Sequence, residues 1–250
     1  MRKIILLTLL LAATNAINAQ DYTQSLSGIE WVKIESKTDI IVKTHDKKEI
    51  LIKANANSTR LTEKAKGLKL VGEGGTANTD IGFYVIKEGN NLIVRNLRKS
   101  KKAIIYLPAS QNISAKTTWS GDIKIYDFKS EIEATAELNG SIEIEDVNGP
   151  VTASSLNGQI NVIFTKVNQK SPITIYSTNG ELDVSLPKST AADLQLYSTN
   201  GEIYTNFEIN TPSKDGMKSV SSKKTSGIIN NGGVKIKLKT TNGNIYLREK

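Results

Sequence analysis

From residue 120 to the end of the chain, apolar and polar residues alternate in short runs, and most runs follow an Asn-Gly dipeptide. Apolar residues recur two and four positions after each glycine, with polar residues between them. A period of two predicts β-strands that place one row of side chains inward and the other outward. The pattern occurs at residues 120–125, 139–144, 157–162, 179–184, 200–205 and 242–247.

The glycines of these units are 19, 18, 22, 21 and 42 residues apart, and the last interval is twice 21. A period of this size predicts stacked repeats that bury their apolar faces against one another. We interpret the longest interval as a repeat without its Asn-Gly corner, with a polar loop over 211–227 and a restart at 230–233. Because Asn and Gly both tolerate positive φ, the dipeptide predicts a sharp corner.

Stacking these units in sequence order predicts two interior ladders of side chains. A fully buried Ile or Leu contributes roughly 1.5–3 kcal/mol, so the ladders would supply much of the core. The first ladder would contain Ile123, Ile142, Ile160, Leu182, Ile203 and Ile245. The second would contain Ile125, Ile144, Val162, Val184 and Leu247, with Thr205 as its polar member.

Two all-β architectures are compatible with this repeat. In a parallel β-helix each unit is one coil of about 20 residues, whereas in an antiparallel β-meander each Asn-Gly closes a hairpin. A hairpin at residues 179–180 would place Ile175 opposite Val184, but a hairpin at 139–140 would place Ile142 opposite Glu137. The register therefore favours the parallel β-helix, with the meander as the alternative.

Strands are also predicted before the repeat, and no linker divides the chain, so residues 20–250 are expected to form a single domain. The predicted strands cover 29–34, 39–43, 49–53, 83–87, 91–95 and 103–108. Residues 58–71 have a helical spacing of Leu61, Ala65 and Leu68, which Gly67 weakens.

Residues 1–19 have the composition of a secretory signal peptide. Arg2 and Lys3 precede an apolar run over 4–13, and small residues over 15–19 form a cleavage region. A membrane-spanning helix needs about 20 apolar residues, which this run does not reach. Cleavage is expected after Ala19, with Ala16 as the alternative, and no later segment predicts a membrane span.

Removal of the two basic residues of the signal lowers the formal net charge from +8 to +6. Outside the cytoplasm, a basic protein is expected to meet anionic glycans or lipid headgroups before nucleic acid. The chain has no Cys and one His, His45, so neither disulfides nor a zinc site of the usual His and Cys type are expected. A lipoprotein anchor, which needs a Cys, is not expected either.

Three segments together resemble a known family. They are Ile104 to Pro108, the strand Ser120-Gly121-Asp122-Ile123-Lys124-Ile125, and the closing Thr240-Thr241-Asn242-Gly243-Asn244-Ile245 after Gly232-Gly233. The chain resembles the DUF4097 family of adhesin-like proteins, and the head-GIN (DUF2807) domains look similar. The resemblance implies a parallel β-helix-like fold in bacterial envelope proteins, and it brings no catalytic residues.

Candidate catalytic groups are few. His45 lies in a polar turn, where a solvated loop residue is the expected interpretation. Carboxylates gather at Glu131, Glu133, Glu137, Glu143, Glu145 and Asp146, and alternation predicts that most lie close together on the outer face. Such a group could bind Ca²⁺ or act in acid–base chemistry, although a solvated acidic face is favoured.

The candidate ligand-binding residues are four tyrosines and three lysines: Tyr176, Tyr197, Tyr204, Tyr246, Lys235, Lys237 and Lys239. Exposed tyrosines on a flat sheet can stack on sugar rings, but they also form ladders between strands. The lysines could hold phosphate or carboxylate groups, or they could protect a sheet edge from aggregation. A basic loop of Arg95, Arg98, Lys99, Lys101 and Lys102 could bind the same anions.

The sequence therefore predicts a non-enzymatic, exported envelope protein that is adhesin-like and presents a β-surface to a glycan or a protein. Its place would be periplasmic, outer-envelope-associated or secreted. No cofactor, metal or nucleic acid is predicted. The alternatives are a polysaccharide-cleaving β-helix enzyme that uses the clustered carboxylates, and a structural or regulatory envelope component.

Overall fold

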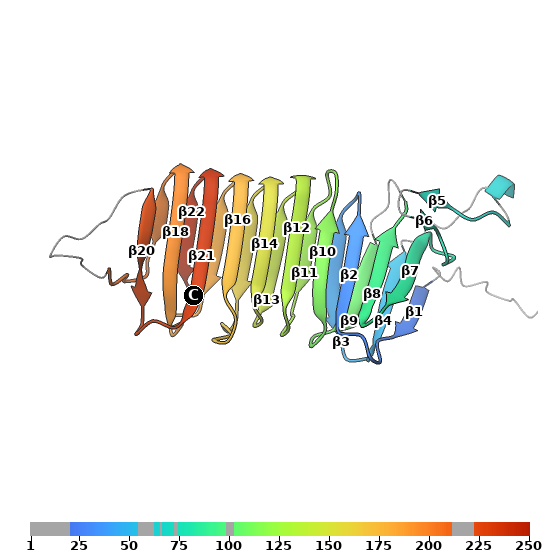
Figure 1. Cartoon of the computed structure of the whole chain (residues 1–250), viewed down its shortest axis with the longest axis horizontal. Coiled ribbons are helices and arrows are strands. Elements are labelled where there is room, and N and C mark those ends of the chain that lie inside the picture. The colour runs from blue at the N-terminus through green and yellow to red at the C-terminus, as the bar shows by residue number, and fades with distance from the viewer. Residues whose placement is uncertain (1–20, 55–62, 66, 73–74, 99–102, 212–222) are drawn as a thin grey trace, which may run out of the picture.

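In a computed structural model of the chain, two ten-stranded sheets form an elongated stack (Figure 1). The structure describes residues 21–54, 63–65, 67–72, 75–98, 103–211 and 223–250. The predicted signal peptide therefore lies outside the described residues, as do residues 58–62 and 66 of the segment with helical spacing. Within the described part, the helical segment is the short 3₁₀ turn η2 (Glu63–Ala65), and no helix there is long and apolar enough to span a membrane.

The strands of the two sheets are named here in spatial order. Sheet A contains β1 (Asp21–Ser25), β4 (Glu49–Ala54), β9 (Ala103–Pro108), β3 (Ile40–His45), β11 (Ile123–Tyr126), β13 (Ile142–Val147), β15 (Ile160–Phe164), β17 (Leu182–Leu186), β22 (Ile245–Glu249) and β19 (Ile203–Thr205). Sheet B contains β20 (Lys224–Ile229), β18 (Ala192–Asn200), β21 (Val234–Asn242), β16 (Ile173–Asn179), β14 (Val151–Asn157), β12 (Ile132–Asn139), β10 (Asn112–Thr117), β2 (Trp31–Ser36), β8 (Asn91–Asn96) and β7 (Phe83–Glu88). A separate hairpin joins β5 (Val71–Gly72) to β6 (Gly75–Thr76).

From β8 to β19 the chain alternates between the two sheets, so one strand of sheet B and the next strand of sheet A make one coil. Every pairing from β10 to β17 is parallel, which confirms the predicted parallel β-helix. The meander is wrong for the repeats. Antiparallel pairs occur at the ends of the stack instead, where β1 and β4 extend sheet A, β7 extends sheet B at the same end, and β20 closes sheet B at the other. The six predicted N-terminal strands correspond to β2, β3, β4, β7, β8 and β9, and β1 was not predicted.

The interior is filled by the two predicted ladders. In the first, Ile123, Ile142, Ile160 and Leu182 pair in register on successive strands. Ile245 then lies next to Leu182, and Ile203 lies beyond Ile245. The ladder members are buried except Ile203 and Thr205, which lie on the edge strand β19. The predicted ladders are therefore confirmed in composition, but the last two coils have exchanged places.

This exchange arises because the last coil of the sequence inserts between two earlier ones. β21 lies between β16 and β18, and β22 lies between β17 and β19 (Figure 1). The prediction of a cornerless repeat in the 42-residue interval is wrong. The interval contains β20, which runs antiparallel to β18, and a turn in which Asn230, Asn231 and Gly232 have positive φ. At the opposite end, β2 and β3 likewise insert between β8 and β10 and between β9 and β11.

The asparagines of the Asn-Gly corners form a continuous ladder of side-chain amides. Asn157 donates to Asn139 (3.2 Å), and Asn179 donates to Asn157 (2.7 Å). Asn242 donates to Asn179 (2.6 Å), and Asn200 donates to Asn242 (2.8 Å). None of these asparagines has positive φ, so the predicted reason for their presence is wrong. The amide is selected because each one can donate to the coil on one side and accept from the coil on the other.

The glycines of the corners are required by close approach between coils. A Cβ on Gly158 would lie 2.0 Å from the carbonyl oxygen of Gly140, and one on Gly180 would lie 2.1 Å from that of Gly158. Of these corner glycines, Gly243 has a positive φ, at 154°. Buried hydroxyls complete the contact by donating to the glycine carbonyls. The pairs are Ser155 with Gly140 (2.9 Å), Ser177 with Gly158 (3.0 Å), Thr240 with Gly180 (2.8 Å) and Ser198 with Gly243 (2.8 Å).

The substitution Gly158→Ala tests this packing. Its Cβ would overlap the backbone of the neighbouring coil, which can only move by opening the stack. We expect the free energy of unfolding to fall by about 3 kcal/mol in urea denaturation. The control is Gln159→Ala at the exposed next residue, which should change stability by less than about 0.5 kcal/mol. Equal stability of the two variants would contradict the close approach.

Candidate functional site

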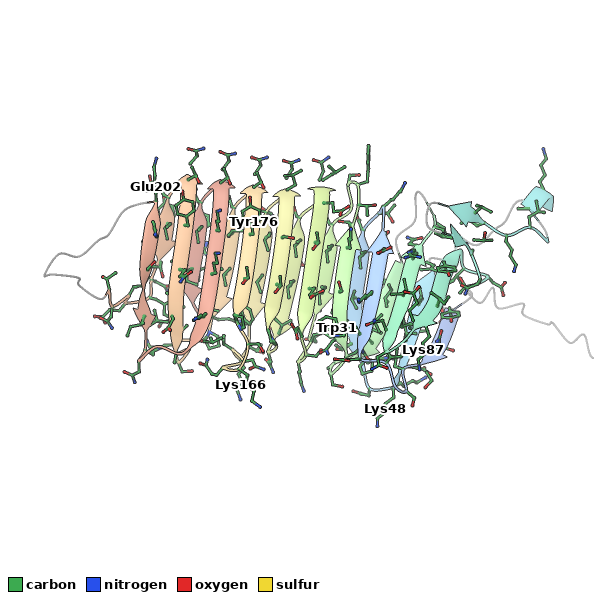
Figure 2. The ribbon with its side chains drawn as sticks, in the orientation of Figure 1. Trp31, Lys48, Lys87, Lys166, Tyr176 and Glu202 are labelled. Carbon is green, nitrogen blue, oxygen red and sulfur yellow. The ribbon has the colours of Figure 1, made fainter. Side chains whose placement is uncertain are left out.

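The seven predicted ligand-binding residues divide between the outer faces of the two sheets. Tyr176 on β16, Tyr197 on β18 and the three lysines on β21 point outward from sheet B. Tyr204 on β19 and Tyr246 on β22 belong to sheet A. Figure 2 shows Tyr176 on sheet B. The set is therefore two groups, and we call Tyr176, Tyr197, Lys235, Lys237 and Lys239 the lysine–tyrosine face.

Lys239 lies between the two tyrosines of this face. The register places Tyr176 opposite it on one side and Tyr197 opposite it on the other. Its Nζ is 5.7 Å from the ring centroid of each tyrosine. Each cation–π contact at an exposed site contributes roughly 0.5–1 kcal/mol. The ammonium group of Lys239 is therefore held in place from both sides.

Hydroxyl groups surround the tyrosine on β16. Tyr176 Oη is 3.1 Å from Thr178 Oγ1. Hydrogen bonds with Thr178 and Thr241 lower the pKa of Tyr176, with a smaller contribution from the charge of Lys239. One edge of the lysine–tyrosine face is consequently rich in hydroxyl groups that can exchange hydrogen bonds with a ligand.

The three lysines of β21 lie on an interior strand. Because β21 has a parallel neighbour on each side, they do not protect a sheet edge, and that interpretation is wrong. Within the described ranges, none of the three forms an ion pair. Elsewhere on sheet B, cations pair with acids on adjacent strands, as Lys116 does with Glu137 (2.6 Å). The column on β21 is thus a concentration of positive charge, with Asp193 beside Lys235 as the acidic residue on the adjacent strand β18.

The tyrosines of sheet A belong to a network within the protein. The rings of Tyr204 and Tyr246 stack with centroids 5.3 Å apart and planes 11° apart. Arg248 lies over Tyr246 and donates two hydrogen bonds to Asp183, at 2.7 and 2.9 Å. This pair has the arrangement of a stabilising cross-strand ladder, although 52% of Tyr204 is exposed.

The six carboxylates do not form one group. Glu133 and Glu137 lie on sheet B, while Glu143 and Glu145 lie on sheet A. The prediction that they gather on one surface is wrong, because successive strands alternate between opposite sheets. In the part of the chain that the structure describes, no three His, Cys, Asp or Glu side chains are placed to hold a metal ion.

The remaining candidates have local roles. His45, the last residue of β3, has its Nε2 2.7 Å from the carbonyl oxygen of Glu49, the first residue of β4. Arg95 was predicted in the basic loop but lies on strand β8, where it pairs with Glu35 at 2.8 Å. Burial lowers the pKa of Arg98. Lys99, Lys101 and Lys102 lie outside the described residues.

Residues 114–248, more than half of the chain, match the model of the family described as Toastrack DUF4097. The chain belongs to the Toastrack DUF4097 family. The matched range covers the repeating coils from β10 to β22, including the inserted last coil and the lysine–tyrosine face. The predicted resemblance to DUF4097 is thereby confirmed, and the likeness to head-GIN domains stays a prediction.

Two solved structures are similar to this Toastrack chain. One is a proposed cell adhesion protein from Clostridium sporogenes, with 12% identity and a TM-score of 0.48, covering 92% of this chain and 99% of the other. The second is a proposed adhesin from Bacteroides fragilis, with 12% identity and a TM-score of 0.44, covering 92% and 96%. No curated protein matches the chain.

Sequence reasoning did not identify the neighbours that complete the Toastrack lysine–tyrosine face. Gln195 lies beside Lys237, Asp193 beside Lys235, and Lys224 beside Tyr197. Their alternation within strands was visible in the sequence. The position of Asp193 and Gln195 beside the lysines was not, because it depends on the insertion of β21. The position of Lys224 depends on the antiparallel pairing of β20 with β18.

A prediction concerns Glu143, whose carboxylate accepts hydrogen bonds from Lys124 and Tyr126 at 2.6 Å each. The bond from Lys124, followed by that from Tyr126, lowers its pKa below 4.5. A carboxyl with a depressed folded-state pKa stabilises the fold above its unfolded pKa and loses this contribution as the pH falls through the folded value. We expect Glu143→Gln to destabilise the protein at pH 7 and to have a progressively smaller effect below pH 4.5.

The measurement is the free energy of unfolding in urea at several pH values from 7 to 3. Glu145→Gln on the same strand is the control, because within the described ranges Glu145 forms no ion pair. An effect of Glu143→Gln that stays constant over this pH range would contradict the proposed role of the two hydrogen bonds.

Proposed function

We propose that this Toastrack protein is an exported, non-enzymatic and adhesin-like component of the cell envelope. Its lysine–tyrosine face contacts a glycan or a protein partner. Support for export comes from the basic start, apolar run and small-residue region of residues 1–19. The protein acts in the periplasm, at the outer envelope or after secretion.

The observation that carries the proposal is the column of three lysines on an interior strand. Alternate residues of a strand lie about 6.8 Å apart, so neighbouring ammonium groups repel by about 0.6 kcal/mol in water. This cost is small, and the column does not protect a sheet edge, because β21 has a neighbour on each side. An approaching negative or polar surface would be attracted to all three charges at once.

The flat shape of the region also favours binding over catalysis. The outward residues of β16, β18, β20 and β21 include four lysines and one aspartate, and they lie on a regular sheet. The alternative of a polysaccharide-cleaving enzyme was based on a cluster of carboxylates. These carboxylates lie on opposite sheets, so they do not support that alternative. A structural or regulatory role would use the same face if the partner were another envelope protein.

The test is binding of the mature protein to isolated envelope fractions and to a panel of glycans. We expect the triple variant Lys235→Ala, Lys237→Ala, Lys239→Ala to bind at least about tenfold more weakly, a loss of about 1.4 kcal/mol. The matched control removes the same charge from the other end of the stack through Lys33→Ala, Lys48→Ala and Lys87→Ala.

The control should bind as the unchanged protein does, and thermal unfolding should show that both triple variants are folded. Equal binding by both variants would mean that the lysine–tyrosine face is not the contact surface. Absence of binding to any envelope fraction or glycan would refute the proposed function.

A further inference from the structure

The charge on the lysine–tyrosine face is arranged as a line. Lys235, Lys237 and Lys239 alternate along β21 and span about 13 Å from the first to the last. A small anion would meet one of these ammonium groups, whereas an extended chain with negative groups at intervals would meet all three. The linear arrangement therefore favours a polymeric anion.

One of the three ammonium groups is ordered before any ligand arrives. Ordering a lysine side chain costs up to about 2 kcal/mol in rotamer entropy. The contacts of Lys239 Nζ with Tyr176 and Tyr197, each at 5.7 Å, restrict this side chain in the free protein. A ligand that binds Lys239 avoids that part of the ordering cost, which raises its affinity.

Each of the two tyrosines has one ring face occupied by a cation. Lys239 lies over one face of each ring, and the next residues along the row are Ser154 beside Tyr176 and Lys224 beside Tyr197. Nucleobases bind aromatic platforms by stacking on an open ring face. Lys239 occupies one such face of each ring, while the tyrosine hydroxyls can exchange hydrogen bonds with a ligand.

The groups around the lysines match a polyhydroxylated ligand. Thr178 and Thr241 interact with the hydroxyl of Tyr176, Gln195 lies beside Lys237, and Thr174 lies on its other side. Hydroxyl and amide groups both donate and accept hydrogen bonds, as sugar hydroxyls do. The outward residues of β16, β18, β20 and β21 include lysines and no arginine. They therefore offer ammonium point charges and no planar guanidinium group, which binds phosphate through two parallel hydrogen bonds.

We propose that the lysine–tyrosine face binds an acidic polysaccharide whose carboxylates contact Lys235, Lys237 and Lys239. Hydroxyls of the same chain bond to the surrounding threonine, tyrosine and glutamine side chains. This inference rests on the proposed function and names the ligand class of its contact surface. Because the face is assembled from β16, β21 and β18, a bound chain would hold the inserted coil between its neighbours and raise the unfolding temperature.

The experiment compares polygalacturonate with the same polymer after full methyl esterification, using calorimetry on the mature protein. We expect polygalacturonate to bind, to raise the thermal unfolding midpoint and to bind more weakly as salt screens the charges. The methyl ester should bind at least about tenfold more weakly, which corresponds to about 1.4 kcal/mol. Lys239→Gln should weaken binding about fivefold or more. Without ligand its unfolding midpoint should fall by only about 2–8 °C, because the two cation–π contacts that it loses contribute roughly 1–2 kcal/mol together.

Three results would overturn the inference. Equal binding of the ester and the acid would remove the carboxylate contact. Tighter binding of single-stranded DNA than of polygalacturonate at the same salt concentration would assign the face to nucleic acid. Binding to envelope fractions without binding to polygalacturonate would refute the acidic polysaccharide and leave the proposed function standing. The variant with Lys33, Lys48 and Lys87 changed to Ala controls for net charge, and its affinity for polygalacturonate should be unchanged.

Discussion

The structure depends on how closely one coil can approach the next at the corner of the stack. Interior ladders of Ile, Leu and Val would pack in more than one register, since their side chains are similar in size. The corners are more restrictive, because a Cβ on Gly140 would lie 2.2 Å from the carbonyl oxygen of Gly121. Buried hydroxyls and the ladder of asparagine amides satisfy the polar groups at the same corner. Register along the repeats is therefore set by backbone contact and hydrogen bonds, and the hydrophobic core follows it.

The same constraint explains how a candidate contact surface arises on a regular sheet. Fixed register brings Tyr176, Lys239 and Tyr197 into one row, although the first and last of these in the sequence are more than 60 residues apart. Along the rest of the sheet, the same register places acids beside bases, as with Arg95 and Glu35. The lysine–tyrosine face and the rest of sheet B have the same backbone arrangement, so they differ only in their outward side chains. The chemical character of this face is thus determined by its outward side chains, while the backbone and the inward side chains maintain the fold.

Much of this fold could be predicted from the sequence, because periodic burial has a local signature. The ladder of Ile123, Ile142 and Ile160 was predicted correctly from alternation and spacing alone. The exchanged order of the last two coils could not be predicted, since Ile203 and Ile245 occupy equivalent places in their units and fit either neighbour. The sequence analysis attributed the glycines of the corners to positive φ, whereas the structure shows that close approach between coils requires most of them. Both causes select glycine, so the sequence cannot distinguish them. The unpredicted order of the last coils also prevented prediction of the candidate site, since the neighbours of Lys239 depend on which coil lies beside β21.

The inserted coil has a consequence for the order of assembly during synthesis. The strands β18 and β19 precede β21 and β22 in the chain, so they emerge first, when β16 and β17 form the most recently added coil of the stack. Their corner sequences, Tyr-Ser-Thr-Asn-Gly-Glu at 176–181 and at 197–202, are identical, and Ser198 could donate to the carbonyl of Gly180 as Thr240 does in the finished protein. Early docking of β18 onto β16 would therefore be a well-bonded but premature state, which must open again to admit the final coil. Completion of the stack would then require β21 to enter between two strands that already pair.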